Sequence, residues 1–283
     1  MKRVLSAIVL IPAALFLVIY APPAIYLVCV CALGSLCLYE YCGLIRNMGI
    51  RIQAWFVFPV FWILLCVMGI WGIRQSGTIF GWDAPLDAGY AVAGITAAQL
   101  AVFLAAVWRG RLSMRERVLS LMAETLGVFY FALFLYAMFS VRFEFGNTAG
   151  LQWTILLLAV IWANDIAALA VGRKLGRTLF APRLSPKKTN EGAVGGLIAG
   201  VVVAVILQRF LFADLSAVHV IAVSILGGVF GQIGDLAESL LKRAAEVKDS
   251  SQLIPGHGGA LDRVDSLLFV FPVSYIYLVF FYN

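Results

Sequence analysis

Nine long apolar runs constrain what this chain can fold into. A helix needs about 20 consecutive apolar residues to cross a bilayer, and continuous rather than alternating runs indicate helices instead of barrel strands. Of the 283 residues, 63% are hydrophobic and 13% are charged, whereas a soluble domain carries about 25% charged residues. We therefore predict an all-α integral membrane protein, a polytopic bundle of about nine transmembrane helices at residues 4–20, 23–45, 54–73, 88–108, 119–140, 151–172, 193–212, 217–238 and 265–281.

The basic residues predict how these helices are oriented. With the amino terminus inside, all 21 lysines and arginines fall on the inner side except Arg74, Arg142 and Arg209. Because positive charge concentrates on the cytoplasmic side, we predict a cytoplasmic amino terminus and an outside carboxyl terminus. The setting expected for such a chain is the bacterial cytoplasmic, or inner, membrane. Loops facing anionic lipid account for the net charge of +6 without any nucleic acid partner.

The chain changes character near residue 148. Residues 1–148 hold about five predicted helices with short loops, which we interpret as structural and lipid-facing. Residues 149–283 hold about four predicted helices, with polar residues concentrated at the inside and glycine stripes that indicate close helix packing. We interpret this second part as catalytic. The roles of Glu40 and Glu124 in the first part stay open between function and simple access to water.

Two polar stretches precede the glycine-rich seventh predicted helix. Asp165 shares a helical face with small residues, so we predict that its carboxylate points into the bundle. A structural aspartate bonded to a neighbouring helix is the alternative. The loop "PRLSPKKTNEG" precedes the glycine-rich helix and predicts a polyanion site, or a merely solvated basic loop. Its candidate donors are Ser185, Lys187, Lys188 and Thr189.

Two further stretches supply carboxylates. Asp235, Ser239 and Lys242 recur at helical spacing on one face of the eighth predicted helix, with Glu238 adjoining. The stretch "IPGHGGALDRVDS" then joins glycines, which permit close approach to a ligand, to Asp262 and Asp265. Carboxylates three residues apart share a helical face and suit Mg²⁺, which commonly binds substrate phosphates as well. We predict a metal site made by Asp235, Asp262 and Asp265; helix caps and ion pairs are the alternative.

The stretch "SLLKRAAEVKDSSQLIPGHGGALDRVDS", residues 239–266, resembles the signature of the phosphatidate cytidylyltransferases, also called CDP-diacylglycerol synthases. The resemblance covers about residues 150–283, and it departs at Asn190, where an aromatic residue is commoner. It implies transfer of CMP from CTP to phosphatidic acid for phospholipid biosynthesis, at the cytoplasmic side, with Mg²⁺ and with a second cation left open. The catalytic candidates are Asp165, Asp235, Lys242, Asp262 and Asp265. The substrate-binding candidates are Ser185, Lys187, Lys188, Thr189, Ser239, Arg243, Lys248, Asp249, His257, Gly258, Gly259 and Arg263.

Two other functions fit parts of the same pattern. A secondary transporter also places carboxylates near glycine-rich helices, but it should show repeat symmetry and acidic residues at mid-membrane depth. A CTP-dependent lipid-alcohol kinase would handle the nucleotide similarly and use an alcohol as the nucleophile. The sequence leaves open the role of His257 and whether the small-residue stripes support a homodimer. CTP, phosphatidic acid and membrane lipids are the expected partners.

Overall fold

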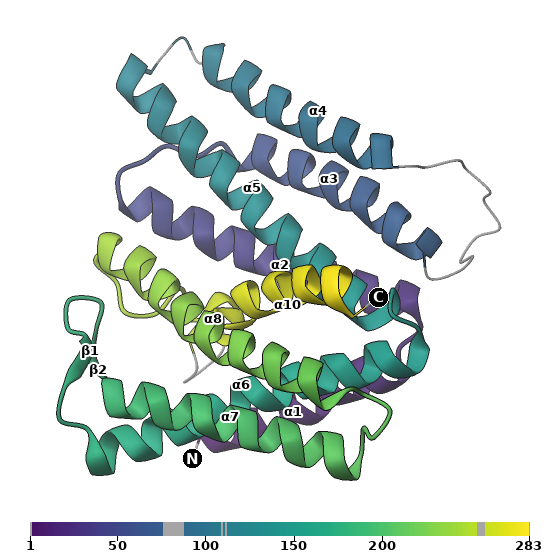
Figure 1. The fold of residues 1–283 in the computed structure, drawn as a ribbon. Helices are drawn as coiled ribbons and strands as arrows, with labels where there is room; N and C mark the ends of the chain where they lie inside the picture. Colours follow the sequence, from purple (N-terminus) through teal and green to yellow (C-terminus); the bar gives the residue numbers. More distant parts are fainter. Residues whose placement is uncertain (1, 76–87, 109, 111, 254–257, 283) are drawn as a thin grey trace. The chain divides into compact units, whose positions relative to one another are not determined.

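The computed structural model describes residues 2–75, 88–108, 110, 112–253 and 258–282. His257 lies outside the described residues. Within them the chain is all-α in class, and its only strands form one antiparallel hairpin (Figure 1). The elements in chain order are α1 (Lys2–Tyr20), α2 (Pro23–Asn47), α3 (Ala54–Gln75), α4 (Ala88–Val107), α5 (Met114–Phe143), α6 (Asn147–Leu175), β1 (Leu179–Ala181), β2 (Ser185–Thr189), α7 (Asn190–Phe210), α8 (Ala217–Ala244), α9 (Leu261–Val264) and α10 (Leu267–Phe281).

Within the described part of the chain, five helices are long and apolar enough to cross a membrane. They are α2, α5, α6, α7 and α8, and four shorter apolar helical segments lie in α1, α3, α4 and α10. The chain is thus a helical membrane protein, as the apolar runs predict. The total of about nine spans and the sides on which the two termini lie stay predictions. Helix α8 has 28 residues, so it is about 42 Å long and exceeds the about 30 Å of a bilayer core.

The chain forms two compact units. The first contains residues 1–139 and 244–262, and the second contains residues 140–243 and 263–283. The segment 244–262, which includes much of the signature, therefore belongs with the amino-terminal helices. The predicted division of labour near residue 148, structural before it and catalytic after it, stays a prediction.

In the first unit, helices α2 and α5 are fixed to each other by an aromatic contact and a hydrogen bond. The ring of Tyr41 meets the ring of Phe131 edge-on with 5.8 Å between centroids, and its hydroxyl donates to the Ala123 carbonyl at 2.8 Å. Both rings are fully buried. Buried aromatic pairs of this kind stabilise packing beyond the area that they cover, and the contact holds the stretch of α2 that carries Glu40.

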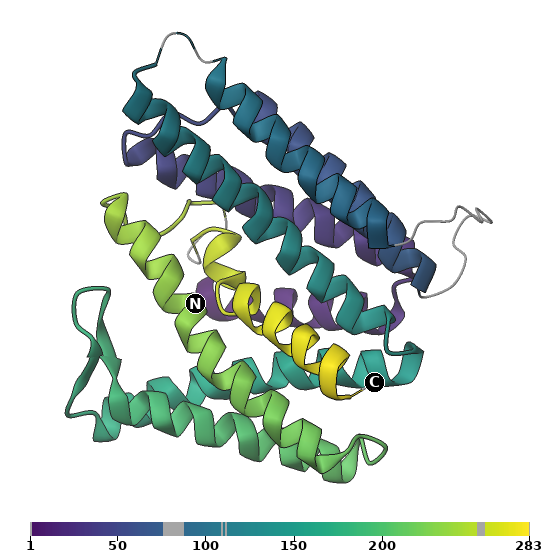
Figure 2. The ribbon, with the colours of Figure 1, turned by 45° about the horizontal axis from the view of Figure 1, so that its top comes forward.

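In the second unit, the glycine stripe packs α7 against α6, as the sequence predicts. Both views show the two helices side by side (Figures 1 and 2). A Cβ at Gly192 would lie 2.7 Å from the Ala168 carbonyl oxygen, and one at Gly196 would lie 2.7 Å from that of Asn164. Only glycine permits backbones to approach this closely. This contact sets the position of the α6 turn that carries Asp165.

The start of the ninth apolar run differs from the expectation that Asp262 and Asp265 share one helical face. Asp262 and Arg263 lie in the short helix α9, which ends at Val264, and α10 begins at Leu267. Asp265 lies between these two helices, where its Oδ1 accepts the Ser266 backbone N–H at 2.6 Å. An aspartate that bonds a nearby backbone group in this way competes with helix continuation. The two carboxylates therefore do not share one uninterrupted helix.

Candidate active site

A pocket of about 340 Å³ lies in the second unit, lined by residues of α6, β1, β2, α7 and α8. The antiparallel pairing of β1 with β2 carries the basic loop from the end of α6 to the start of α7. The structure brings together at this pocket five residues that the sequence singles out, namely Asp165, Lys187, Lys188, Thr189 and Asp235. The pocket therefore combines carboxylates with ammonium groups, which is the composition needed to hold phosphates and a cation.

The two charge types are in direct contact there. The ammonium group of Lys188 forms an ion pair with the Asp235 carboxylate, and both side chains are about one-third exposed. Lys187 is exposed beside it. Thr189 is the N-cap of α7, and its hydroxyl oxygen accepts the Gly192 N–H at 3.1 Å, as N-cap threonines commonly do. The basic loop is thus anchored at its carboxyl end by the helix that follows it.

The pocket contains a polar pair that sequence reasoning missed. Gln232 donates from its amide nitrogen to the Asn164 side-chain oxygen at 3.1 Å and to the Ala193 carbonyl at 2.9 Å. Asn164 is buried, and both residues line the pocket. Their positions relative to the predicted site residues could have revealed them. Asn164 directly precedes Asp165, and Gln232 lies three residues before Asp235 on the same face of α8.

Three carboxylates converge beside the pocket: Asp235, Glu238 and Asp265 each offer an oxygen within 4.8 Å of the others. Gly234 makes this possible, since a Cβ there would lie only 2.5 Å from the Asp265 carbonyl oxygen. The sequence placed Asp235 and Asp265 in one metal site but noted Glu238 only as a neighbour. Asp262, the third predicted ligand, belongs to the first unit, and its role as a ligand stays a prediction.

Further residues of α8 surround this cluster. Glu238 is buried and forms an ion pair with Lys242 one turn later. Ser239 lies with its hydroxyl 3.5 Å from Asp235 Oδ1. Arg243 is exposed and donates from Nε to the Leu184 carbonyl at 3.3 Å, which connects α8 to the hairpin. The polar side chains on the predicted face of α8 therefore lie around the carboxylate cluster.

The acidic cluster fits a hard divalent cation. Its donors are all carboxylate oxygens, which Mg²⁺ and Ca²⁺ prefer. Three carboxylates this close repel one another unless a cation or a proton offsets their charge. The neighbouring ammonium groups of Lys188 and Lys242 supply part of that compensation. Asp235, Glu238 and Asp265 are thus the residues that could hold a metal ion.

The signature segment of the first unit has a separate hydrogen-bond network. Asp262 Oδ2 accepts from the Ser250 N–H at 2.9 Å, the Ser250 hydroxyl at 2.7 Å and the Gly259 N–H at 2.8 Å. Gly258 adopts a φ of +78°, a conformation that favours glycine. Lys248 and Asp249 are exposed. Within its own unit, the Asp262 carboxylate thus holds the loop residues Ser250 and Gly259 in place through hydrogen bonds.

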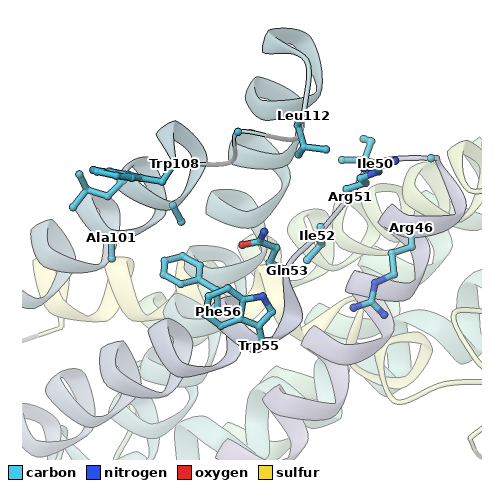
Figure 3. A pocket seen from close by; sticks show the side chains of 14 residues that line it. Arg46, Ile50, Arg51, Ile52, Gln53, Trp55, Phe56, Ala101, Trp108 and Leu112 are labelled. Atoms are coloured by element: carbon cyan, nitrogen blue, oxygen red, sulfur yellow. The ribbon is translucent and has the colours of Figure 1, made fainter.

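A larger pocket, of about 1290 Å³, lies in the first unit. Figure 3 shows Arg46 and the aromatic side chains of Trp55, Phe56 and Trp108 around it. The described residues that line it include no carboxylate and none of the candidate site residues from the sequence. We assign the chemistry to the smaller pocket because phosphoryl chemistry needs groups that can hold a cation as well as an anion.

Fold and site together define a helical membrane protein in which a carboxylate cluster adjoins a lysine-bearing pocket. The particular family follows from comparison with known proteins. The model of the cytidylyltransferase family matches residues 1–281, so the chain belongs to that family.

Three bacterial relatives are named phosphatidate cytidylyltransferase. The chain is 43% identical to that of Bacillus subtilis (strain 168) over 132 residues, which are 47% of this chain and 49% of the relative. It is 42% identical over 130 residues to that of Staphylococcus haemolyticus (strain JCSC1435), covering 46% and 50% of the two chains. It is 40% identical over 133 residues to that of Staphylococcus saprophyticus, and these residues are 47% of this chain and 51% of the relative. The chain thus matches about half the length of these relatives.

Proposed function

We propose that this protein transfers CMP from CTP to phosphatidic acid, giving CDP-diacylglycerol and pyrophosphate. Family membership and the named relatives support this proposal. The observation that carries it is the convergence of Asp235, Glu238 and Asp265 beside a pocket lined by Lys187 and Lys188. Phosphoryl transfer depends mainly on positioning and on charge stabilisation, and this arrangement offers groups of both signs.

In the proposed reaction, a phosphate oxygen of phosphatidic acid attacks the α-phosphorus of CTP. A new P–O–P link forms, and the bond from the α-phosphorus to the oxygen that bridges to the β-phosphorus breaks. Pyrophosphate leaves with that oxygen and its electron pair. No general base is needed, because a phosphate oxygen of the lipid is already ionised at neutral pH. The protein must therefore bring two polyanions together and offset their repulsion.

The basic groups are the parts of this chain suited to that task. Lys187 and Lys188 lie on the hairpin and line the pocket, where they would attract a phosphate that enters. Lys242 and Arg243 lie on α8, two turns beyond Asp235. We assign the hairpin lysines to the single headgroup phosphate of the lipid. We assign CTP to the second basic set, Lys242, Arg243 and Arg263, because its triphosphate can also complete the shell of a metal ion.

Mg²⁺ is the cofactor that we propose, held by Asp235, Glu238 and Asp265, with Asp262 as the further ligand expected from the sequence. When bound, the ion would supply positive charge to phosphate oxygens of the nucleotide. We place the site at the cytoplasmic face of a bacterial inner membrane. The reason is that CTP comes from the cytosol, phosphatidic acid comes from the bilayer, and the basic residues cluster on the predicted inner side.

The test is a product assay on purified protein in mixed micelles with CTP and Mg²⁺. Phosphatidic acid should yield pyrophosphate and CDP-diacylglycerol in equal amounts, and isoprenoid alcohols should yield neither. Formation of CDP together with a phosphorylated alcohol would identify a kinase and overturn the proposal. An absence of CTP turnover with every lipid would also overturn it.

A further inference from the structure

Glu40 is a buried carboxylate of α2, only 3% exposed. Among the described residues, its hydrogen bonds all come from the signature segment of the same unit. Oε1 accepts from the Ser251 hydroxyl at 2.7 Å and from the Ala260 N–H at 2.9 Å. Oε2 accepts from the Ser250 hydroxyl at 2.9 Å and from the Leu261 N–H at 2.8 Å. A carboxylate offers about four acceptor positions, and this one segment places a donor at each of them, although the Ser250 hydroxyl is shared with Asp262.

The arrangement specifies a carboxylate at this position. Each oxygen receives one hydroxyl and one backbone N–H, and a backbone N–H can only donate. A glutamine would place its NH₂ group at one of the two oxygen positions, whichever way the amide was turned. It would therefore always face either the Ala260 N–H or the Leu261 N–H, donor against donor. Bonds to an ionised acceptor are also about twice as strong as neutral ones.

Glu40 also connects to Asp262 through Ser250. The Ser250 hydroxyl lies 2.9 Å from Glu40 Oε2 and 2.7 Å from Asp262 Oδ2, so the two carboxylates share its single hydrogen. Gly259 lies against both Ser250 and Glu40, with no space for a Cβ. Asp262 in turn accepts the Gly259 and Ser250 N–H groups. Residues 250–251 and 258–262 are thus joined to one another around the Glu40 side chain.

We propose that Glu40 is a positioning residue for the signature segment, and that it sets the place of Asp262 and of Arg263 beside it. The proposal rests on the function proposed above, in which those two residues belong to the active site. It gives the amino-terminal helices a task beyond packing and contact with lipid. Glu40 acts through the segment that it holds, and it is not assigned any contact with substrate.

Three variants of the full-length protein test this. Glu40→Gln keeps the shape of the side chain but replaces one of its two acceptor oxygens by an NH₂ donor. Glu40→Asp keeps both acceptor oxygens on a shorter side chain. Glu124→Gln is the matched control, because Glu124 is another fully buried carboxylate of the first unit, and its Oε1 accepts the Gln53 N–H at 2.9 Å. Thermal unfolding in detergent measures how much each variant destabilises the whole protein.

Amide hydrogen exchange at residues 250–253 and 258–261 is the readout that does not depend on activity. Glu40→Gln should raise exchange there by about tenfold to a hundredfold, as expected for losing bonds to a charged acceptor, and Glu124→Gln should leave it unchanged. Turnover should fall by a similar factor in Glu40→Gln, with partial recovery in Glu40→Asp. Unchanged exchange in Glu40→Gln would overturn the proposal, and so would equal effects of Glu40→Gln and Glu124→Gln.

The same measurements separate this proposal from the proposed function. If wild-type protein makes no CDP-diacylglycerol but exchange rises in Glu40→Gln, Glu40 anchors the segment and the assigned reaction is wrong. If wild-type protein is active and Glu40→Gln matches it in turnover, the assigned reaction stands and the positioning role is wrong.

Discussion

The ammonium group of Lys188 on β2 forms an ion pair with the Asp235 carboxylate on α8. The pair connects the basic hairpin directly to the acidic cluster, because Asp235 is also one of the three clustered carboxylates. A phosphate that enters the pocket would compete with Asp235 for Lys188, and a cation would compete with Lys188 for Asp235. Substrate and metal should therefore strengthen each other's binding, since each releases a partner for the other.

Removing one basic group from each predicted substrate site should affect the two substrates differently. Lys188→Ala should mainly raise the KM for phosphatidic acid, whereas Arg263→Ala should mainly impair use of CTP. The loss of one charge-assisted phosphate contact should weaken binding of the affected substrate by about 10- to 150-fold. Steady-state kinetics with both substrates varied in mixed micelles provides the measurement. Lys174→Ala is the control, since Lys174 is exposed at the end of α6 and is not among the lining residues of the pocket. A reversed pattern would exchange the two assignments, and equal effects would indicate one shared anion site.

Glu238 should contribute to cation binding although sequence reasoning did not select it. Glu238→Gln removes one charge from the cluster, so the protein should need at least about tenfold more divalent ion, as expected for losing a contact to a charged group. Binding of Mn²⁺, followed by electron paramagnetic resonance without substrate, measures this directly. Glu246→Gln is the control because Glu246 is an exposed acid shortly after α8. Wild-type Mn²⁺ affinity in Glu238→Gln would remove this residue from the metal site.

The close approach of α8 to Asp265 should depend on glycine at position 234. A Cβ there would meet the Asp265 carbonyl oxygen at 2.5 Å, and backbone cannot move aside as a flexible side chain can. Gly234→Ala should destabilise the protein by about 1–3 kcal/mol and should weaken Mn²⁺ binding by displacing Asp265. Gly43→Ala is the matched control in α2, where a Cβ would meet nothing within 4 Å. Thermal unfolding in detergent compares the two, and equal stability would contradict the packing argument.

The predicted orientation is tested by thiol labelling from each side of the membrane, after the five native cysteines have been replaced. A cysteine at position 187 should react with a membrane-impermeant maleimide only from the cytoplasmic side, and one at position 283 only from outside. The reason is the concentration of basic residues on the predicted inner side. If position 187 were labelled only from outside, the topology would be the inverse of the predicted one. The proposed site would then lie on the side of the membrane opposite to the cytosolic CTP.

The sequence by itself determined the class of the protein and the family to which it belongs. Apolar runs are a local property, and local hydropathy decides whether a segment prefers lipid to water, so the all-α membrane class could be predicted. Spacing within one helix fixes which residues share a face, so the polar face of α8 could be predicted as well. The glycine stripe of α7 was also readable, because small residues indicate close packing wherever the partner helix lies.

Tertiary structure alone decided which side chains meet. Glu40 and Leu261 lie 221 positions apart in the sequence, and no periodicity relates them. Glu238 joins Asp265 only because Gly234 lets the backbone between α9 and α10 approach α8. Asp262 lies in α9, whereas Asp265, three residues later and expected on the same helix, lies in the break between α9 and α10. Helical spacing predicts neighbours only within an unbroken helix, and contacts between helices depend on packing that residues far apart in the chain determine jointly.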